Sequence, residues 1–286
     1  MIGSTTEHCI LSDDLLARCR KRAPEYDRDN RFFTEDFDEL RQAGYLLMAV
    51  PEELGGLGLN LAEVGRAQRR PAHHAPAPAL ASHMHLYCTG HAEAGNDIPV
   101  LLSTTKAEPV EGGYRFTGHK AFGSLSPVWT YLGIHGMDTS DPQAPKIVHA
   151  FMPRGTPGSS TKETWDVLGM RATRSDDTLL EGAFVPDQYI ARVVPAGAAG
   201  IDMFVLGIFA WGLLGFANIY YGLAQRALDL TIDSVKKKSV LALSRSMAYH
   251  AEVQHSIAEM VLESVGNAWC HNRLPLRHPD TQTLCR

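Results

Sequence analysis

The chain has 286 residues and a formal net charge of -5, with 44% hydrophobic and 21% charged residues. This composition is typical of a soluble globular protein, and its mild acidity excludes a general electrostatic attraction to nucleic acid or to anionic membranes. The 5 cysteines are scattered and form no Cys-x-x-Cys pair, so neither a disulfide framework nor a zinc site is expected. We therefore expect reduced thiols in a cytoplasmic protein, with no signal peptide in its first residues.

The N-terminal part of the chain has the periodicity of helices. Ser12, followed by two aspartates and an apolar repeat, is typical of a helix N-terminus. The sequence LLMAVPEELGGLGLN predicts a turn-rich connection, because its proline and glycines interrupt a helix. The adjacent His73 and His74 are expected in a loop, since no third ligand has metal spacing. Three helices are predicted here, one starting at Ser12, one over Glu35 to Ala43 and one over Leu61 to Gln68.

The period changes to that of strands between about residue 98 and residue 194. Polar and apolar residues alternate in KAEPVEGGYRFTGHKAFGSL on both sides of Glu111-Gly112-Gly113, as in a hairpin. Asp176 and Asp177 are expected to be solvated residues of a structural turn. No Gly-x-Gly-x-x-Gly follows a strand, so a dinucleotide-binding βαβ unit and a nicotinamide cofactor are not expected. Further strand-like runs are WTYLGIHGM, KIVHAFMP, KETWDVLGM and DTLLEGAFVP, which together predict a small barrel or sandwich.

Helical periodicity returns at about residue 200. The apolar stretch from Met203 to Ala217 contains glycine and is too short to span a bilayer, so it predicts a buried helix and no membrane association. The sequence from about residue 264, which includes Pro275, has neither the periodicity of a helix nor that of a strand. Two helices are predicted in this region, one over Ile201 to about Lys236 and one over Ala248 to Glu263.

The order of these regions predicts an α+β fold with three parts. Residues 1-90 are expected to form a shortened N-terminal helical domain, and residues 91-196 a middle β domain of barrel or sandwich type. Residues 197-286 are expected to form a C-terminal helical bundle that is incomplete, or truncated, with an irregular tail from about 264.

Five motifs in chain order carry a resemblance to a known family. They are AVPEELGGLGL (Ala49 to Leu59), GHAEAGND (Gly90 to Asp97), GYRFTGHKAFGS (Gly113 to Ser124), LGMRATRSDDTLLEGAFVP (Leu168 to Pro186) and GLAQRALD (Gly222 to Asp229). Each motif alone is weak, but together they resemble the acyl-CoA dehydrogenase superfamily of flavoproteins. The resemblance implies FAD as cofactor, an acyl-CoA thioester as substrate, and a homo-oligomer, either dimer or tetramer, if the bundle is competent.

The resemblance also implies a set of flavin contacts. In the family, the segment that matches GHAEAGND lies along the flavin, an aromatic residue covers the ring, and a hydroxyl lies near the hydride-accepting nitrogen. A basic residue reaches the cofactor phosphates of a neighbouring subunit. The matching cofactor-binding positions are Ala92, Gly95, Asn96, Phe122, Ser124 and Lys238. Without the family context, an ordinary turn, a core phenylalanine and a solvated helix end would explain the same residues.

The reaction that the resemblance implies is α,β-desaturation of an acyl-CoA in fatty acid metabolism. A carboxylate removes the α proton while the β hydrogen leaves as hydride to FAD. In the family this carboxylate is a glutamate, either on the first long helix of the bundle or late in the bundle. No glutamate occurs between Ile201 and Lys236, and the late position lies beyond residue 286, so no catalytic residue is assigned.

Three hypotheses remain open from the sequence. The first is an acyl-CoA dehydrogenase-like oxidoreductase, and the second is a flavin-dependent monooxygenase of the same fold, which needs no glutamate base. The third is a non-catalytic, truncated remnant or an interaction subunit. It is suggested by the incomplete bundle and by the prediction of a single helix, where the family has two, between the Gly-rich turn and Gly90.

Overall fold

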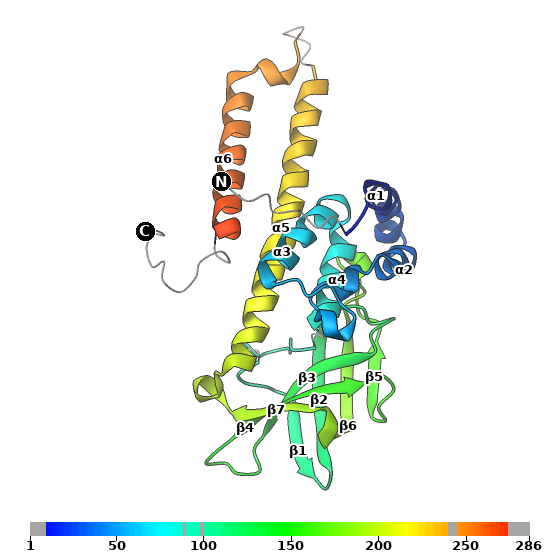
Figure 1. The fold of residues 1–286 in the computed structure, drawn as a ribbon, viewed down its shortest axis with the longest axis vertical. Helices are drawn as coiled ribbons and strands as arrows, with labels where there is room; N and C mark the ends of the chain where they lie inside the picture. Colours follow the sequence, from blue (N-terminus) through cyan, green and yellow to red (C-terminus); the bar gives the residue numbers. More distant parts are fainter. Residues whose placement is uncertain (1–9, 88–89, 98–99, 240–244, 274–286) are drawn as a thin grey trace. The chain divides into compact units, whose positions relative to one another are not determined.

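The computed structural model describes residues 10–87, 90–97, 100–239 and 245–273. The elements run in the order helices, sheet, helices, which confirms the predicted α+β class (Figure 1). The chain divides into two compact units. One consists of Met1–Lys21, Glu39–Ala79 and Leu214–Arg286, and the other of Arg22–Asp38 and Leu80–Leu213.

The N-terminal helices begin at the residues that cap them. The Leu15 amide donates to Ser12 Oγ at 3.2 Å at the start of α1 (Asp13–Arg28), as predicted. The second predicted helix is α2 (Thr34–Gln42). Asn60 and Glu63 form a reciprocal capping box at the start of α3 (Leu61–His74). The connection before α3 needs glycine, because a Cβ at Gly56 would lie 2.1 Å from the Val50 carbonyl oxygen.

The prediction of a single helix between the Gly-rich turn and Gly90 was wrong. A further helix, α4 (Pro76–Tyr87), follows α3, which itself continues to His74. Pro76 is the first residue of α4, where an amide hydrogen would have no acceptor within the helix, so proline is compatible with this helix start. His73 and His74 form the last turn of α3, and His73 Nε2 lies 2.7 Å from Asp229 Oδ2. Within the described residues no group of three or more His, Cys, Asp or Glu could hold a metal ion.

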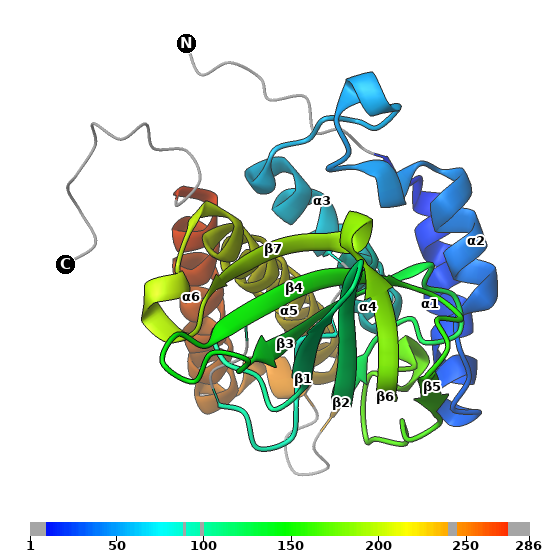
Figure 2. The same ribbon diagram turned by 90° about the horizontal axis from the view of Figure 1, so that it is seen from below.

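The strands form one seven-stranded sheet in the order β5-β6-β2-β1-β3-β4-β7 (Figure 2). The predicted hairpin is present as the antiparallel pair β1 and β2, and among the strand pairs of the described residues only β1 and β3 run parallel. The strand between β1 and β3 in the chain is β2, so the described strands contain no βαβ crossover. The strands are β1 (Lys106–Val110), β2 (Gly113–Gly123), β3 (Tyr131–Asp138), β4 (Lys146–Pro153), β5 (Ser159–Lys162), β6 (Asp176–Pro186) and β7 (Ile190–Pro195).

The run KETWDVLGM is not a strand beyond Lys162, contrary to the prediction. The amides of Thr164 and Trp165 donate to Asp176 Oδ1 at 3.1 and 3.0 Å instead of to a neighbouring strand. A side chain thus replaces the ladder partner, which lets the segment leave the sheet as a loop.

The two faces of the sheet differ in chemistry because successive side chains point to opposite sides. One face is apolar and includes Phe116, Ile134, Ala150 and Val185, all at most 2% exposed. The opposite face carries buried polar side chains, among them His135 on β3 and His149 on β4. Those polar groups adjoin the candidate site.

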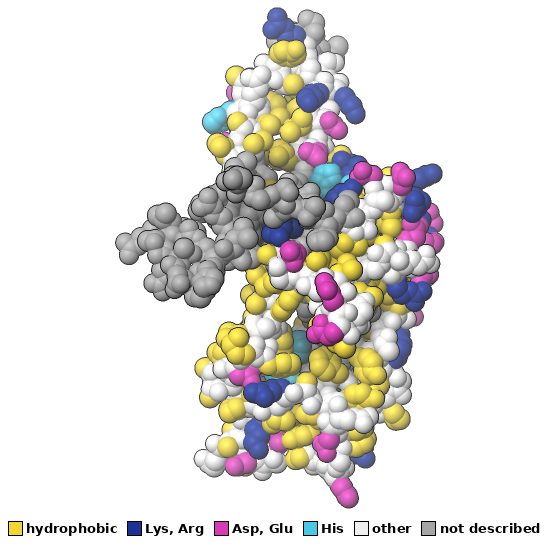
Figure 3. All heavy atoms as spheres, viewed as in Figure 1, with side chains coloured by type: hydrophobic (Ala, Val, Ile, Leu, Met, Phe, Trp, Pro, Cys, Tyr) yellow, Lys and Arg dark blue, Asp and Glu magenta, His cyan; other side chains and the backbone are white. Residues whose placement is uncertain are grey.

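The helices after the sheet are α5 (Met203–Lys237) and α6 (Ala251–Arg273). The prediction of an irregular tail from about 264 was wrong as far as Arg273, because no proline interrupts the helix before Pro275. The apolar run of α5 is also less buried than predicted, with Met203 81% and Leu213 63% exposed. Hydrophobic side chains are visible on the face of the molecule that Figure 3 shows. Of the described helices, α5 alone is long and apolar enough to cross a membrane, a criterion that a core helix of a soluble protein also meets.

Candidate functional site

The candidate site lies where residues 90–97 meet the end of β2. Ala92 and Ala121 form an isolated antiparallel bridge, in which the Ala121 amide donates to the Ala92 carbonyl at 2.9 Å. The bridge brings two motifs together that are separated in the sequence. Ala92 and Gly95 therefore belong to the same compact unit as Phe122 and Ser124. Lys238 belongs to the other unit, where it is exposed directly after α5.

Phe122 has an unusual conformation for a bulky residue. Its φ is 57° and its side chain is 58% exposed, so it is not a core residue. Its ring lies edge-on to the indole of Trp165 at a centroid distance of 5.8 Å. The pair offers an accessible aromatic surface, of which the sequence identified only Phe122.

The side chain of Asn96 is engaged within the protein. Its Nδ2 donates to Glu93 Oε2 and to the Leu102 carbonyl, both at 2.8 Å. Both amide hydrogens therefore fix the segment 90–97 instead of projecting as spare donors.

Left-handed residues other than glycine gather in the two loops beside Ser124. Phe122 and Leu125 have φ of 57° and 65°, and Met170 and Arg174 have φ of 59° and 42°. The loops are joined by the Leu125 amide, which donates to the Thr173 carbonyl at 3.0 Å. Such conformations persist where the surroundings enforce them, and they concentrate at binding and catalytic sites.

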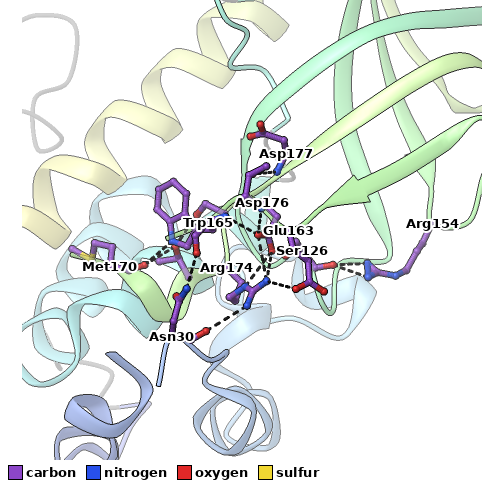
Figure 4. A network of polar contacts seen from close by, with 12 residues as sticks. Asn30, Ser126, Arg154, Glu163, Trp165, Met170, Arg174, Asp176 and Asp177 are labelled. Atoms are coloured by element: carbon purple, nitrogen blue, oxygen red, sulfur yellow. Dashed lines mark hydrogen bonds and ion pairs between the residues drawn. The ribbon is translucent and has the colours of Figure 1, made fainter. Parts of the chain in front are cut away.

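Asp176 holds these loops together (Figure 4). Its carboxylate accepts hydrogen bonds from the amides of Thr164 and Trp165 and from Ser126 Oγ, and it pairs with Arg174 at 3.2 Å. Burial alone would raise the pKa of Asp176, but the hydrogen-bond donors outweigh burial, so its pKa lies below the usual value of an aspartate. The sequence predicted a solvated Asp176, which is wrong: the residue is 1% exposed because backbone amides and Arg174 replace water.

The same network orients Trp165. Its indole Nε1 donates to the Met170 carbonyl at 3.1 Å, and its own carbonyl accepts from Asn30 Nδ2 at 3.0 Å (Figure 4). Arg154 in turn donates to the Ser126 carbonyl at 2.6 Å. The aromatic surface therefore rests on a framework of hydrogen bonds.

A buried ion pair anchors residues 90–97 to β2, and sequence reasoning missed it. Lys120 Nζ lies 2.5 Å from Glu93 Oε1, and both side chains are at most 1% exposed. The carboxylate also accepts from Ser103 Oγ at 2.7 Å and from the Thr104 amide at 2.8 Å. Burial lowers the pKa of Lys120 to about 8, while Glu93 opposes this shift. Both residues lie inside recognised motifs, and their position beside the flavin-contact residues was the signal that could have revealed the pair.

Three histidines pack beside this ion pair. The ring of His135 lies 5.0 Å from that of His91 and 5.9 Å from that of His149. His135 Nε2 lies 3.0 Å from the Leu102 carbonyl and must carry the hydrogen there. In the neutral ring Nδ1 then accepts from His91 Nδ1, which lies 3.0 Å away. Both ring nitrogens of His149 are buried without a hydrogen-bond partner.

We expect the free energy of unfolding to decrease as the pH falls from about 6.5 to about 4. Burial lowers the pKa of His135 to about 3 and of His149 to about 4; Lys120 contributes to both shifts, Glu93 opposes the first, and Asp202 opposes the second. The unfolded chain then binds more protons in this window, which costs about 1.4 kcal/mol per pH unit for each histidine. Urea unfolding at several pH values measures the slope.

His149→Phe should reduce this slope by about one proton, because phenylalanine does not titrate and the substitution breaks no hydrogen bond of the buried ring nitrogens. Phe204 already packs against His149 at 5.4 Å. His255→Phe is the matched control, since the His255 side chain is 76% exposed. Equal slopes in the two variants would contradict the assignment to the buried cluster.

Comparisons with known proteins show which family the chain resembles. Residues 14–97 match the family model described as acyl-CoA dehydrogenase, N-terminal domain. Dibenzothiophene monooxygenase of Rhodococcus erythropolis is 31% identical over 245 residues, which cover 75% of this chain and 59% of that protein. Mitochondrial isovaleryl-CoA dehydrogenase of Solanum tuberosum is 26% identical over 274 residues, which cover 83% of this chain and 64% of that protein.

A solved structure supports the fold. FMN-bound TdsC from Paenibacillus sp. A11-2 has a TM-score of 0.71 at 22% identity, and the match covers 94% of this chain and 77% of that one. At this identity the likeness shows the fold alone. The matched region spans about three fifths of the two sequence relatives, at 59% and 64% of their lengths.

Proposed function

Because the chain belongs to the acyl-CoA dehydrogenase superfamily, we propose that it is a flavin-dependent oxidoreductase and that its chemistry is that of a monooxygenase. The junction of residues 90–97 with the end of β2 carries this proposal. There the Ala92–Ala121 bridge, the exposed Phe122 and the hydroxyl of Ser124 lie on one strained framework.

These residues fit a flavin. Phe122 and Trp165 would hold the ring through their accessible aromatic surface. Ala92 and Gly95 are small, so backbone amides can approach a polar ring edge. Ser124 would meet the hydride-accepting nitrogen. FAD and FMN carry the same ring, and Lys238 would act on the additional phosphate of an FAD bound by a neighbouring subunit.

A monooxygenase is favoured over a dehydrogenase by the composition of α5. This helix is described along its whole length and contains no glutamate, so one of the two family positions for a desaturating base is empty. Bound reduced flavin would supply electrons to dioxygen, a reaction that needs no carboxylate at the substrate. Dibenzothiophene monooxygenase, at 31% identity, supports the same choice.

An acyl-CoA dehydrogenase is the second candidate. Isovaleryl-CoA dehydrogenase supports it at 26% identity, and its substrate would be an acyl-CoA thioester. The exposed apolar side chains of α5, among them Leu206 and Leu213, support assembly into a homo-oligomer for either candidate.

The test is the absorbance spectrum of the purified chain after incubation with FMN or FAD and removal of free flavin. We expect a protein-bound flavin band that acyl-CoAs do not bleach without oxygen. Reduced flavin bound to the chain should be reoxidised when oxygen is admitted. Bleaching by an acyl-CoA would instead support the dehydrogenase, and release of NAD(P) without flavin would overturn both candidates.

A further inference from the structure

A chain of three hydroxyl groups leads inward from the candidate flavin site. Ser124 Oγ lies 2.8 Å from Ser175 Oγ, which lies 2.7 Å from Thr173 Oγ1. Thr173 Oγ1 lies 2.8 Å from the carbonyl oxygen of Met170. Ser175 and Thr173 are buried, whereas Ser124 is half-buried. The chain therefore begins at the predicted flavin hydroxyl and ends at a backbone carbonyl.

The direction of these hydrogen bonds follows from counting hydrogens. A carbonyl oxygen can only accept, so the Thr173 hydroxyl must donate to Met170. Each hydroxyl has one hydrogen, so Thr173 must accept from Ser175. The hydrogen of Ser175 is then used, and Ser124 must donate to Ser175. Ser124 consequently presents only lone pairs toward the site.

The backbone around the three hydroxyl groups holds them in position. The amide of Leu125 donates to the Thr173 carbonyl, which ties the loop of Ser124 to the loop of Thr173 and Ser175. Leu125 follows Ser124 at one end of the series of hydroxyl groups, and Met170 accepts the last hydrogen bond at the other end. Both residues have a left-handed backbone conformation. The three hydroxyls are thus held at fixed separations by the framework that surrounds the site.

We propose that Thr173 and Ser175 act as positioning residues that fix Ser124 as a hydrogen-bond acceptor, so that the site binds reduced flavin in preference to oxidised flavin. This inference rests on the proposed function, in which Ser124 meets the hydride-accepting nitrogen of the ring. That nitrogen offers a lone pair in the oxidised ring and an N–H in the reduced ring. A Ser124 hydroxyl that can only accept forms a hydrogen bond with the N–H of the reduced ring. The same hydroxyl places its lone pairs against the lone pair of the oxidised ring, which is unfavourable.

The expected discrimination is on the order of tenfold, the size of one hydrogen bond gained in place of an unfavourable contact. By linkage, a tenfold preference for the reduced form raises the two-electron midpoint potential of the bound flavin by about 30 mV. The dissociation constants of oxidised FMN and of dithionite-reduced FMN, titrated without oxygen, measure the ratio directly. The midpoint potential of bound relative to free FMN gives a second readout.

Two substitutions at one position test the role of the hydroxyl chain. Thr173→Val keeps the shape but removes the acceptor of Ser175, whose hydrogen can then turn to Ser124 and free the Ser124 hydrogen for the site. The preference for reduced FMN should then disappear or reverse. Thr173→Ser keeps the hydroxyl and should keep both the preference and the potential shift, and circular dichroism of each variant shows whether it is folded.

Each outcome has a defined meaning. A wild-type preference that disappears in Thr173→Val and persists in Thr173→Ser supports the inference. Equal affinities for the two forms in the wild type, or the same preference in Thr173→Val, would overturn it while leaving the proposed function intact. Failure to bind FMN in either form would contradict the proposed function, and the inference with it.

Discussion

Glu93→Gln should lower the free energy of unfolding by about 3 to 5 kcal/mol, the usual cost of removing one partner from a buried ion pair. Glutamine has nearly the same shape, but it leaves the ammonium of Lys120 buried without its counter-charge. The substitution also replaces one of the two carboxylate oxygens with an NH2 donor, which then faces either Ser103 Oγ or the Thr104 amide, since these donate to different oxygens. Thermal unfolding should show a Tm lower by roughly 10 °C.

A second glutamate provides the control for this experiment. Glu108 also pairs with a lysine, Lys106, at 2.5 Å, but both side chains are about half exposed. Glu108→Gln should therefore change stability by less than about 1 kcal/mol. The double variant Glu93→Gln/Lys120→Met should recover part of the loss, because it removes the uncompensated charge. Equal effects of the two Glu→Gln substitutions would contradict a buried, mutually dependent pair.

The sequence predicted those parts of the fold that local chemistry determines. The hairpin of β1 and β2 follows from alternation around Gly112 and Gly113, and α5 follows from its apolar period. It did not predict α4, because proline occurs both in the first turn of a helix and in loops, so its presence does not distinguish the two. The extension of α6 to Arg273 was missed because polar residues obscured the helical period.

The candidate site was predictable only in part. Motif order placed Ala92, Phe122 and Ser124 together, and the Ala92–Ala121 bridge shows the contact between their segments. Composition gave no sign that Glu93 or Asp176 would be buried, since a carboxylate is expected at the surface unless its partners are known. Their partners come from distant segments, such as Lys120 for Glu93, and only the tertiary fold brings them together.

Asp176→Asn should destabilise the unit that contains the sheet by about 2 to 3 kcal/mol and should weaken flavin binding with it. The carboxylate of Asp176 accepts two backbone amides on one oxygen, and it accepts Ser126 and Arg174 on the other. An asparagine has a single acceptor oxygen, so its amide group must face either the two amides or Arg174. Either arrangement leaves donors opposed and releases the loop that carries Trp165.

The neighbouring aspartate separates this effect from a general loss of charge. Asp177 lies 2.9 Å from His119 Nε2 across strands β6 and β2, and the two side chains are 22% and 53% exposed, so Asp177→Asn should cost less than about 1 kcal/mol. Urea unfolding gives the difference in stability, and FMN titration under conditions where both variants are folded gives the difference in affinity. If both variants bound FMN equally and unfolded at the same urea concentration, Asp176 would not be the residue that holds the aromatic surface in place. A loss of FMN affinity confined to Asp176→Asn, with Trp165 fluorescence changed in the same variant, would show that the ring site depends on the loop that this carboxylate closes.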